Sequence, residues 1–129
     1  MAMSNPYSQY KQNSIMTASP QELNIMLYKG AMKFIKQSII AIDKKEIEVA
    51  HKSNIRAQDI FIHFMSIVDT NYEVGKNLYS LYDYMQDRLQ EGNIKKDIEI
   101  LQEVYDMTNE LKETWEEAMQ ITKKNKVNI

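Results

Sequence analysis

Glu48 and His51 are the two residues whose types and spacing could most directly do chemistry. They form a Glu-x-x-His pattern, which supplies one third of the ligand residues of a di-iron carboxylate site in a helical bundle. Such a site also needs a second Glu-x-x-His pair and two further glutamates on facing helices, and the chain has only one such pair. The second histidine, His63, does not complete the HExxH pattern of zinc proteases either. The spacing therefore favours a structural role for both histidines.

A histidine phosphotransfer bundle needs only one exposed histidine on a helix, so it is a second chemistry to consider. His51 and His63 lack the basic and glycine-containing surroundings that such sites use. With three glycines and no cysteine, the chain also has no phosphate-cradling loop and no thiolate chemistry. We predict no enzyme activity, no metal and no cofactor. A phosphotransfer bundle or another helical-bundle adaptor is the alternative function.

The composition is that of one soluble domain. The chain has 129 residues, of which 43% are hydrophobic and 26% are charged. Its net charge is −2 with acids and bases well mixed, so it offers no concentrated basic face to nucleic acid. A signal-peptide pattern and a long apolar run are both absent from the sequence. We therefore expect a cytoplasmic protein with no membrane insertion.

The elements that must position any site are helical. Ser19, Pro20 and Glu22 form a helix start with an N-cap, a proline at the first helical position and a capping-box glutamate. This helix is predicted to continue to about Ile42. The pattern predicts that its core-facing side consists of residues at helical spacing, namely Leu23, Leu27, Gly30, Phe34, Ser38 and Ala41.

Three more helices follow. Asp43 to Glu46 repeats the capping-box pattern and predicts a second helix that fades near Asp69. A third helix is expected over Val74 to Leu89, with Gly92 as the residue that ends it, and Asp97 is expected to cap a fourth helix. Short connections favour antiparallel packing, so we predict an all-α fold, an antiparallel four-helix bundle with a short N-terminal helical arm. The predicted divisions are an arm and linker over 1–18, the bundle over 19–122 and a frayed tail over 123–129.

The first helix is apolar around too much of its circumference for a simple bundle. Ile25, Met32 and Ile39, each seven positions apart, are predicted to lie nearly opposite its core-facing side. Ile55 and Ile62 similarly border the core side of the second helix. One interpretation is that the first helix is central and contacts all its neighbours. The other is a second groove that takes an apolar segment from elsewhere.

The segment from Asn5 to Ser14 is a candidate cover for that groove. Asn5 suits an N-cap and Pro6 the first helical position, which would place Tyr7 and Tyr10 on one side of a short helix. Two helical turns are not stable alone in water, so the segment must dock or stay disordered. The sequence leaves open whether the segment docks on the bundle or is disordered.

Four short motifs are distributed along the chain, namely Ser-Pro-x-Glu-Leu at 19–23, Met-Leu-Tyr-x-Gly-Ala at 26–31, Arg-Ala-Gln-Asp-Ile at 56–60 and Leu-Tyr-Asp-Tyr at 81–84. Taken together, they resemble the FliS family of flagellin-specific export chaperones. The resemblance extends from about Pro6 to Ala118. It implies a cytosolic helical bundle without catalytic activity, which binds the disordered C-terminal segment of flagellin. Such chaperones prevent premature polymerisation and deliver flagellin to the flagellar export apparatus, and other flagellar assembly factors are possible further partners.

The resemblance also points to individual positions. It places Tyr7 and Tyr10 in an arm that shares the client surface, and the matching positions in the bundle are Tyr28, Arg56, Asp59, Tyr82 and Tyr84. Whether the arm shields the groove or grips the client is left open. Our predicted partner-binding residues, for the client or for the self-docked arm, are Tyr7, Tyr10, Ile25, Met32, Ile39, Ile55, Ile62 and Tyr82.

Overall fold

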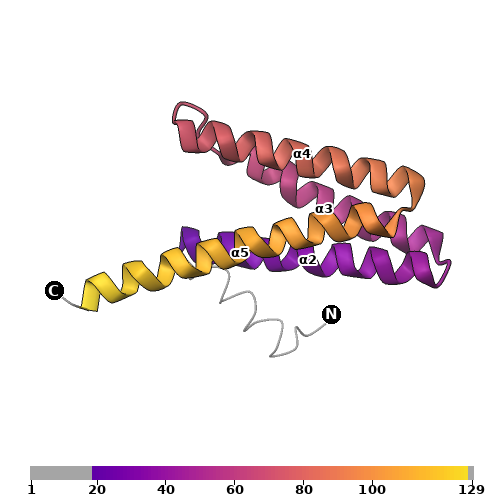
Figure 1. The fold of residues 1–129 in the computed structure, drawn as a ribbon, viewed down its shortest axis with the longest axis horizontal. Coiled ribbons are helices and arrows are strands. Elements are labelled where there is room, and N and C mark those ends of the chain that lie inside the picture. Colours follow the sequence, from indigo (N-terminus) through magenta and orange to yellow (C-terminus); the bar gives the residue numbers. More distant parts are fainter. Residues whose placement is uncertain (1–18, 128–129) are drawn as a thin grey trace, which may run out of the picture.

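The computed structural model describes residues 19–127, and all regular secondary structure in that range is helical (Figure 1). The helices are α2 (Pro20–Asp43), α3 (Ile47–Ile67), α4 (Glu73–Lys95) and α5 (Ile98–Val127). The predicted all-α four-helix bundle is confirmed. Residues 1–18, which include Tyr7 and Tyr10, and residues 128–129 lie outside the described part of the chain.

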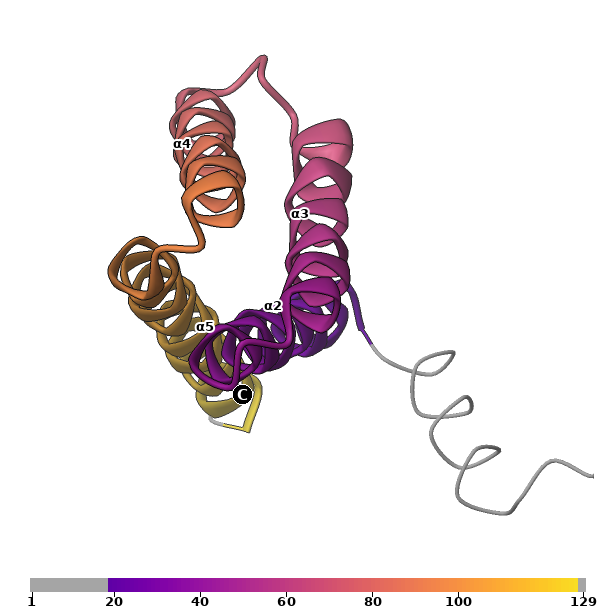
Figure 2. The same cartoon turned by 90° about the vertical axis from the view of Figure 1, so that its right-hand side faces the viewer.

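Each helix packs against the next in chain order, and α5 returns to pack against α2 (Figure 2). Successive helices run in opposite directions, so α5 lies antiparallel to α2. Because α2 has α3 on one side and α5 on the other, two sides of its surface are covered by neighbours. This arrangement is the reason that α2 is apolar around so much of its circumference.

The predicted starts of two helices are confirmed. The Ser19 hydroxyl accepts a hydrogen bond from the Glu22 backbone amide at 3.2 Å and caps α2. At α5, the Asp97 carboxylate accepts from the Glu99 amide at 2.9 Å. In each case the capping side chain acts within three residues, so the signal is local and visible in the sequence.

The predicted capping box at Asp43 to Glu46 is wrong. Asp43 is still helical and ends α2, and Glu46 precedes α3 without a side-chain capping bond. The turn is made instead by Lys45, which adopts a left-handed φ of 62°. Its backbone lets the Glu46 amide donate back to the Ala41 carbonyl at 2.8 Å, so the last carbonyls of α2 are satisfied in a Schellman arrangement.

The predicted end of α4 at Gly92 is also wrong. The helix continues to Lys95, and Lys96 takes the left-handed conformation with φ 52°. Gly92 lies inside α4 and is buried, and a Cβ there would come within 2.8 Å of Leu101 Cδ2 on α5. Gly92 is therefore required for the close approach of α4 to α5.

The fourth helix is longer than predicted. α5 extends to Val127, so the predicted boundary between bundle and tail at residue 122 falls inside it. The division into arm, bundle and tail is otherwise untested and stays a prediction.

The core side of α2 differs in part from the prediction. The side chains that reach the centre of the bundle include Tyr28, Ala31 and Ile35, each fully buried. Ile39, predicted to lie opposite the core, belongs to the core cluster, and Ile25 is also buried. The cause is the position of α5, which covers the side of α2 that the sequence left unassigned.

Polar side chains join α3 to α4 inside the bundle. The Asn54 amide donates to the Leu89 carbonyl at 3.2 Å, the Gln58 amide to Asn54 at 2.6 Å, and the Gln86 amide to Gln58 at 3.0 Å. All three amide side chains are buried. Because each buried donor finds a partner only in this alignment, the chain of bonds fixes how α3 and α4 lie along each other.

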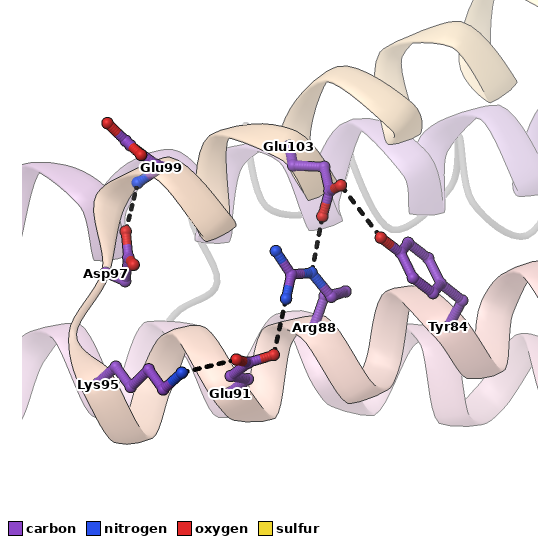
Figure 3. Close-up of polar contacts among 7 residues, drawn as sticks. All are labelled: Tyr84, Arg88, Glu91, Lys95, Asp97, Glu99 and Glu103. Carbon is purple, nitrogen blue, oxygen red and sulfur yellow. Dashed lines mark hydrogen bonds and ion pairs between the residues drawn. The ribbon is translucent and has the colours of Figure 1, made fainter.

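A charged network on the surface joins α4 to α5 (Figure 3). Arg88 on α4 donates to Glu103 on α5 at 2.8 Å and to Glu91 at 2.7 Å. The Tyr84 hydroxyl donates to the second oxygen of Glu103 at 3.1 Å. The hydrogen bond from Arg88 holds the pKa of Glu103 below its usual range. The network therefore connects the two helices as long as Glu103 is ionised.

Candidate functional site

An apolar groove follows the exposed part of α2. We call it the apolar groove, and it has a volume of about 470 Å³. Its apolar lining residues come from three turns of the helix, namely Leu23, Met26, Leu27, Gly30 and Phe34. All of these side chains are only partly buried. Lys29 and Lys33 line the same groove and bring positive charge to it.

The groove borders α3. Gly30 has no side chain, so the groove is deepest at this residue, and a Cβ there would meet Ile60 Cδ1 only at an ordinary contact distance of 3.6 Å. The Arg56 guanidinium lies 5.5 Å from the centre of the Phe34 ring, within cation–π range. Arg56 thus covers one face of Phe34 and adds a further cation beside the groove.

A second groove lies between α2 and α5. Lys29 and Lys33 line this groove as well, so they form the ridge between the two. We call it the basic groove, and its other lining residues are Met32, Lys36, Gln37, Ile40, Tyr105 and Lys112. Its volume is about 490 Å³. The exposed side of α2 therefore offers two adjacent surfaces of different character.

A smaller cleft of about 190 Å³ opens at the end of the bundle where α3 ends and α4 begins. It includes Trp115, the single tryptophan of the chain, and Tyr82. Behind it, the Phe64 ring stacks between Tyr28 and Tyr82, with ring centres 4.7 and 5.1 Å away. The two tyrosine hydroxyls share a 2.5 Å hydrogen bond that links α2 to α4.

Burial raises the pKa of the Tyr28 hydroxyl well above its ordinary value of 10.0, and the neighbouring Tyr82 hydroxyl raises it further. Burial also raises the pKa of Tyr82. Both phenols are therefore neutral hydrogen-bonding groups in the physiological pH range, with no sign of an activated nucleophile or base. Their geometry indicates a structural role in the core.

The structure separates the predicted partner-binding residues into two groups. Met32 lies in the basic groove, and Ile55 and Ile62 are exposed on α3, with 38% and 50% of their surface accessible. Ile25, Ile39 and Tyr82 are instead buried. Tyr7 and Tyr10 lie outside the described residues.

Most residues that line the apolar groove were predicted from the sequence to lie in the core. Leu23, Leu27 and Phe34 have the helical spacing of a buried face, and that spacing cannot tell a core side from a partner-binding side. The available signal was Gly30 between them, since a glycine inside a helix often marks a close approach by another segment.

Glu48 and His51, which have the Glu-x-x-His spacing, form contacts with other side chains and not with each other. Glu48 forms an exposed ion pair with Lys52 at 3.5 Å, and His51 Nδ1 is 2.9 Å from the Asn93 amide nitrogen. Within residues 19–127, no three histidine, cysteine, aspartate or glutamate side chains gather in a way that could hold a metal ion. Over the same residues, no helix is both long enough and apolar enough to cross a membrane.

Residues 19–127 thus define an antiparallel four-helix bundle with two adjacent open grooves on α2. The family model described as "Flagellar protein FliS" matches residues 3–122, and the chain belongs to this family. The curated relatives that match the chain are described as flagellar secretion chaperones.

Curated relatives agree with this assignment. The flagellar secretion chaperone FliS of Bacillus subtilis is 37% identical over 98% of this chain and 95% of the relative. The protein of the same name from Campylobacter jejuni is 32% identical over 87% of this chain and 89% of the relative. A solved structure described as a flagellar chaperone from bacteria superposes with a TM-score of 0.74 over 89% of this chain and 98% of that chain. At 14% identity, it supports the fold alone.

Proposed function

We propose that the protein binds the disordered C-terminal segment of flagellin in the cytoplasm, prevents its premature polymerisation and aids its export, without catalysing a reaction. The observation that carries this proposal is the apolar groove, an open row of apolar side chains on α2 in a chain of this family. A disordered apolar segment that folds on binding fits such a row by the helix-in-groove mode.

The apolar groove contributes a moderate part of the binding energy of a client. Completing the burial of Leu27, Phe34 and Met26 is worth roughly 1.5–3 kcal/mol for each side chain at most, because each is already partly buried. Ordering a disordered client costs about 2–5 kcal/mol and reduces the net binding energy. The balance favours a complex that holds the client and can also release it.

The N-terminal arm is the proposed regulator of this groove. We propose that Tyr7 and Tyr10 dock on the bundle in the free protein and move when the client binds. The support is that the apolar groove begins at Leu23, a few residues after the arm and its linker, so the chain can reach it. The exposed Ile55 and Ile62 on α3 would extend the surface for a client that wraps the bundle.

The further partners are proposals of the same kind. A chaperone of flagellar secretion must pass its client to the export machinery, so we propose contact with the flagellar export apparatus and with other flagellar assembly factors.

The test is a calorimetric titration of the full chain with a synthetic peptide from a flagellin C-terminus. We expect a one-to-one complex with a negative heat-capacity change, as apolar burial requires. Gly30→Leu should fill the groove floor and weaken binding by about tenfold or more, which corresponds to roughly 1.4 kcal/mol.

The matched control is Gly30→Ala, whose added methyl group only meets Ile60 at an ordinary contact distance. It should bind the peptide nearly as the parent chain does. Absence of any heat at high peptide concentration with a folded protein would overturn the proposed function. Equal binding by the Leu and Ala variants would place the client elsewhere on the molecule.

A further inference from the structure

The basic groove is unusual in a chain with a net charge of −2, because it collects four lysines. Three of them, Lys29, Lys33 and Lys36, lie on α2, and Lys112 lies on α5. The residues that line the groove include no acid. Between Leu23 and Ile42, α2 carries no aspartate or glutamate. The groove is therefore locally basic although the chain as a whole is slightly acidic.

These lysines are poorly neutralised within the described part of the chain. No carboxylate in residues 19–127 lies within ion-pair distance of Lys29, Lys33 or Lys36. The Lys36 ammonium lies 5.8 Å from the centre of the Tyr105 ring. Lys112 has one ion pair, with Glu116 at 3.5 Å. The groove thus has free capacity for negative charge.

The floor of the same groove is apolar. Ile40 is 45% exposed, and Met32 and Tyr105 are partly buried beside it. Lysine side chains can extend their aliphatic stems over such a floor while their ammonium groups reach the rim. An occupant that matches this surface needs apolar side chains on one side and carboxylates on the edges. From Lys29 to Ile40 the groove extends about 16 Å along the helix, which is about three helical turns.

We propose that the basic groove binds an acidic amphipathic helical segment of a partner polypeptide. Its apolar residues pack on Met32, Ile40 and Tyr105, and its carboxylates pair with the lysines of the rim. This inference does not rest on flagellin binding. Lys36 and Lys112 line only the basic groove, so the two grooves can be tested separately. Because Lys29 and Lys33 are shared, two bound segments would lie side by side across α2.

The probe is a labelled synthetic peptide of about three helical turns, with leucine on one face and glutamate on the other. Fluorescence anisotropy with the full chain should show saturable binding that weakens as salt rises from low to about 0.15 M. The same peptide with lysine in place of every glutamate should not bind. A polyglutamate of equal length should bind much more weakly, because it cannot use the apolar floor.

The protein variants separate this site from general electrostatics. Lys36→Gln with Lys112→Gln should weaken binding of the acidic peptide by about fivefold to tenfold, which corresponds to about 1–1.4 kcal/mol for the two lost ion pairs together. The matched control, Lys44→Gln with Lys76→Gln, removes the same charge at exposed positions outside the grooves and should have little effect. Ile40→Ser should weaken binding without any change of charge.

Circular dichroism shows whether each variant is folded, and the flagellin peptide shows whether the apolar groove still works. The proposal is overturned if the acidic peptide does not bind to the folded parent chain. It is overturned equally if both lysine double variants lose the same affinity, or if polyglutamate or an oligonucleotide binds as tightly as the amphipathic peptide. Loss of flagellin binding alone would count against the proposed function and not against this groove.

Discussion

Gly92 and Gly30 are both glycines inside helices, and their surroundings give them opposite roles. At Gly92, a Cβ would meet Leu101 Cδ2 at 2.8 Å and Ile100 Cγ2 at 3.1 Å, and both side chains are buried. At Gly30, the nearest atom would be 3.6 Å away. Gly92 allows two helices to approach each other, and Gly30 leaves a surface groove open.

Alanine substitutions should therefore change stability in opposite directions. Gly92→Ala should destabilise the bundle by about 1–3 kcal/mol, because the buried leucine cannot move aside without disturbing the core. Gly30→Ala should stabilise it by about 0.5–1 kcal/mol through helix propensity. Urea unfolding followed by circular dichroism measures both. A shift of the same sign for both variants would contradict the role of Gly92 in helix approach.

The hydroxyl pair of Tyr28 and Tyr82 is the second residue-scale feature with a measurable energy. Tyr28→Phe alone should cost about 1–3 kcal/mol, because it leaves the buried Tyr82 hydroxyl without its partner. The double variant with Tyr82→Phe should cost clearly less than the sum of the two single changes. A double-mutant cycle by thermal unfolding tests this, and additive single costs would exclude coupling between the hydroxyls.

The same pair predicts the behaviour at alkaline pH. The folded-state pKa of both tyrosines is raised above the ordinary value of 10.0, so folding favours the protonated phenols. The two tyrosines contribute fully to the free energy of unfolding below pH 10. This contribution decreases as the pH rises above 10, because the tyrosines of the unfolded chain lose their protons first. The double phenylalanine variant should show a smaller loss of stability in this range.

At the scale of the helices, the starts at Ser19 and Asp97 were predictable from local caps, but the turn after α2 and the end of α4 were not. Ser19 and Asp97 cap through hydrogen bonds to backbone amides within three residues, and such side chains have a strong preference for that position. The ends depend on Lys45 and Lys96 in left-handed conformations, which a lysine rarely adopts. No propensity rule selects a lysine for that place, so the sequence pointed to Gly92 instead.

This difference gives a test of helix termination. Lys45→Gly should stabilise the protein by about 1 kcal/mol, because glycine takes a φ of 62° without steric cost. Lys44→Gly is the matched control at an ordinary φ of −84° and should give no gain. Lys96→Gly should gain less than Lys45→Gly, since it also removes the 2.7 Å hydrogen bond from Lys96 to the Asn93 carbonyl. Thermal unfolding compares the three variants, and equal effects at Lys44 and Lys45 would contradict this account.

At the scale of the whole molecule, periodicity and short connections predicted the four-helix architecture. They did not predict which apolar sides of α2 are buried and which line a groove. A helix with neighbours on two sides is apolar in several directions, and periodicity gives no order among them. Tyr28 is fully buried because its hydroxyl meets that of Tyr82, 54 positions away, and no local pattern contains that pairing. Ile39 lies in the core and Phe34 lines the apolar groove, because the packing of the neighbouring helices decides which apolar side of α2 is covered.

The proposed arm gives a prediction for the molecule in solution. Tyr7→Ala with Tyr10→Ala should tighten binding of the flagellin peptide by up to about tenfold, because a docked arm reduces the fraction of competent protein. The free variant should also aggregate more readily, since its groove is uncovered. Calorimetry and light scattering measure the two effects.

The control for the arm is Tyr72→Ala with Tyr79→Ala, which removes two exposed rings from α4 and its N-cap. It should change neither property. Unchanged binding and aggregation in the arm variant would contradict the idea of a cover. Weaker binding would show that the two rings contact the client directly.

The packing of α5 on α2 joins the two ends of the described bundle, and this has a consequence for biosynthesis. Chains emerge from the ribosome with the N-terminus first, and domains fold as units. α2, α3 and α4 are all made before α5, so the side of α2 that includes Ile39 and Met32 has no partner until α5 has been made. A chaperone of this fold therefore passes through a period in which it exposes apolar surface like that of a client, and it completes its own bundle only once α5 has packed on α2.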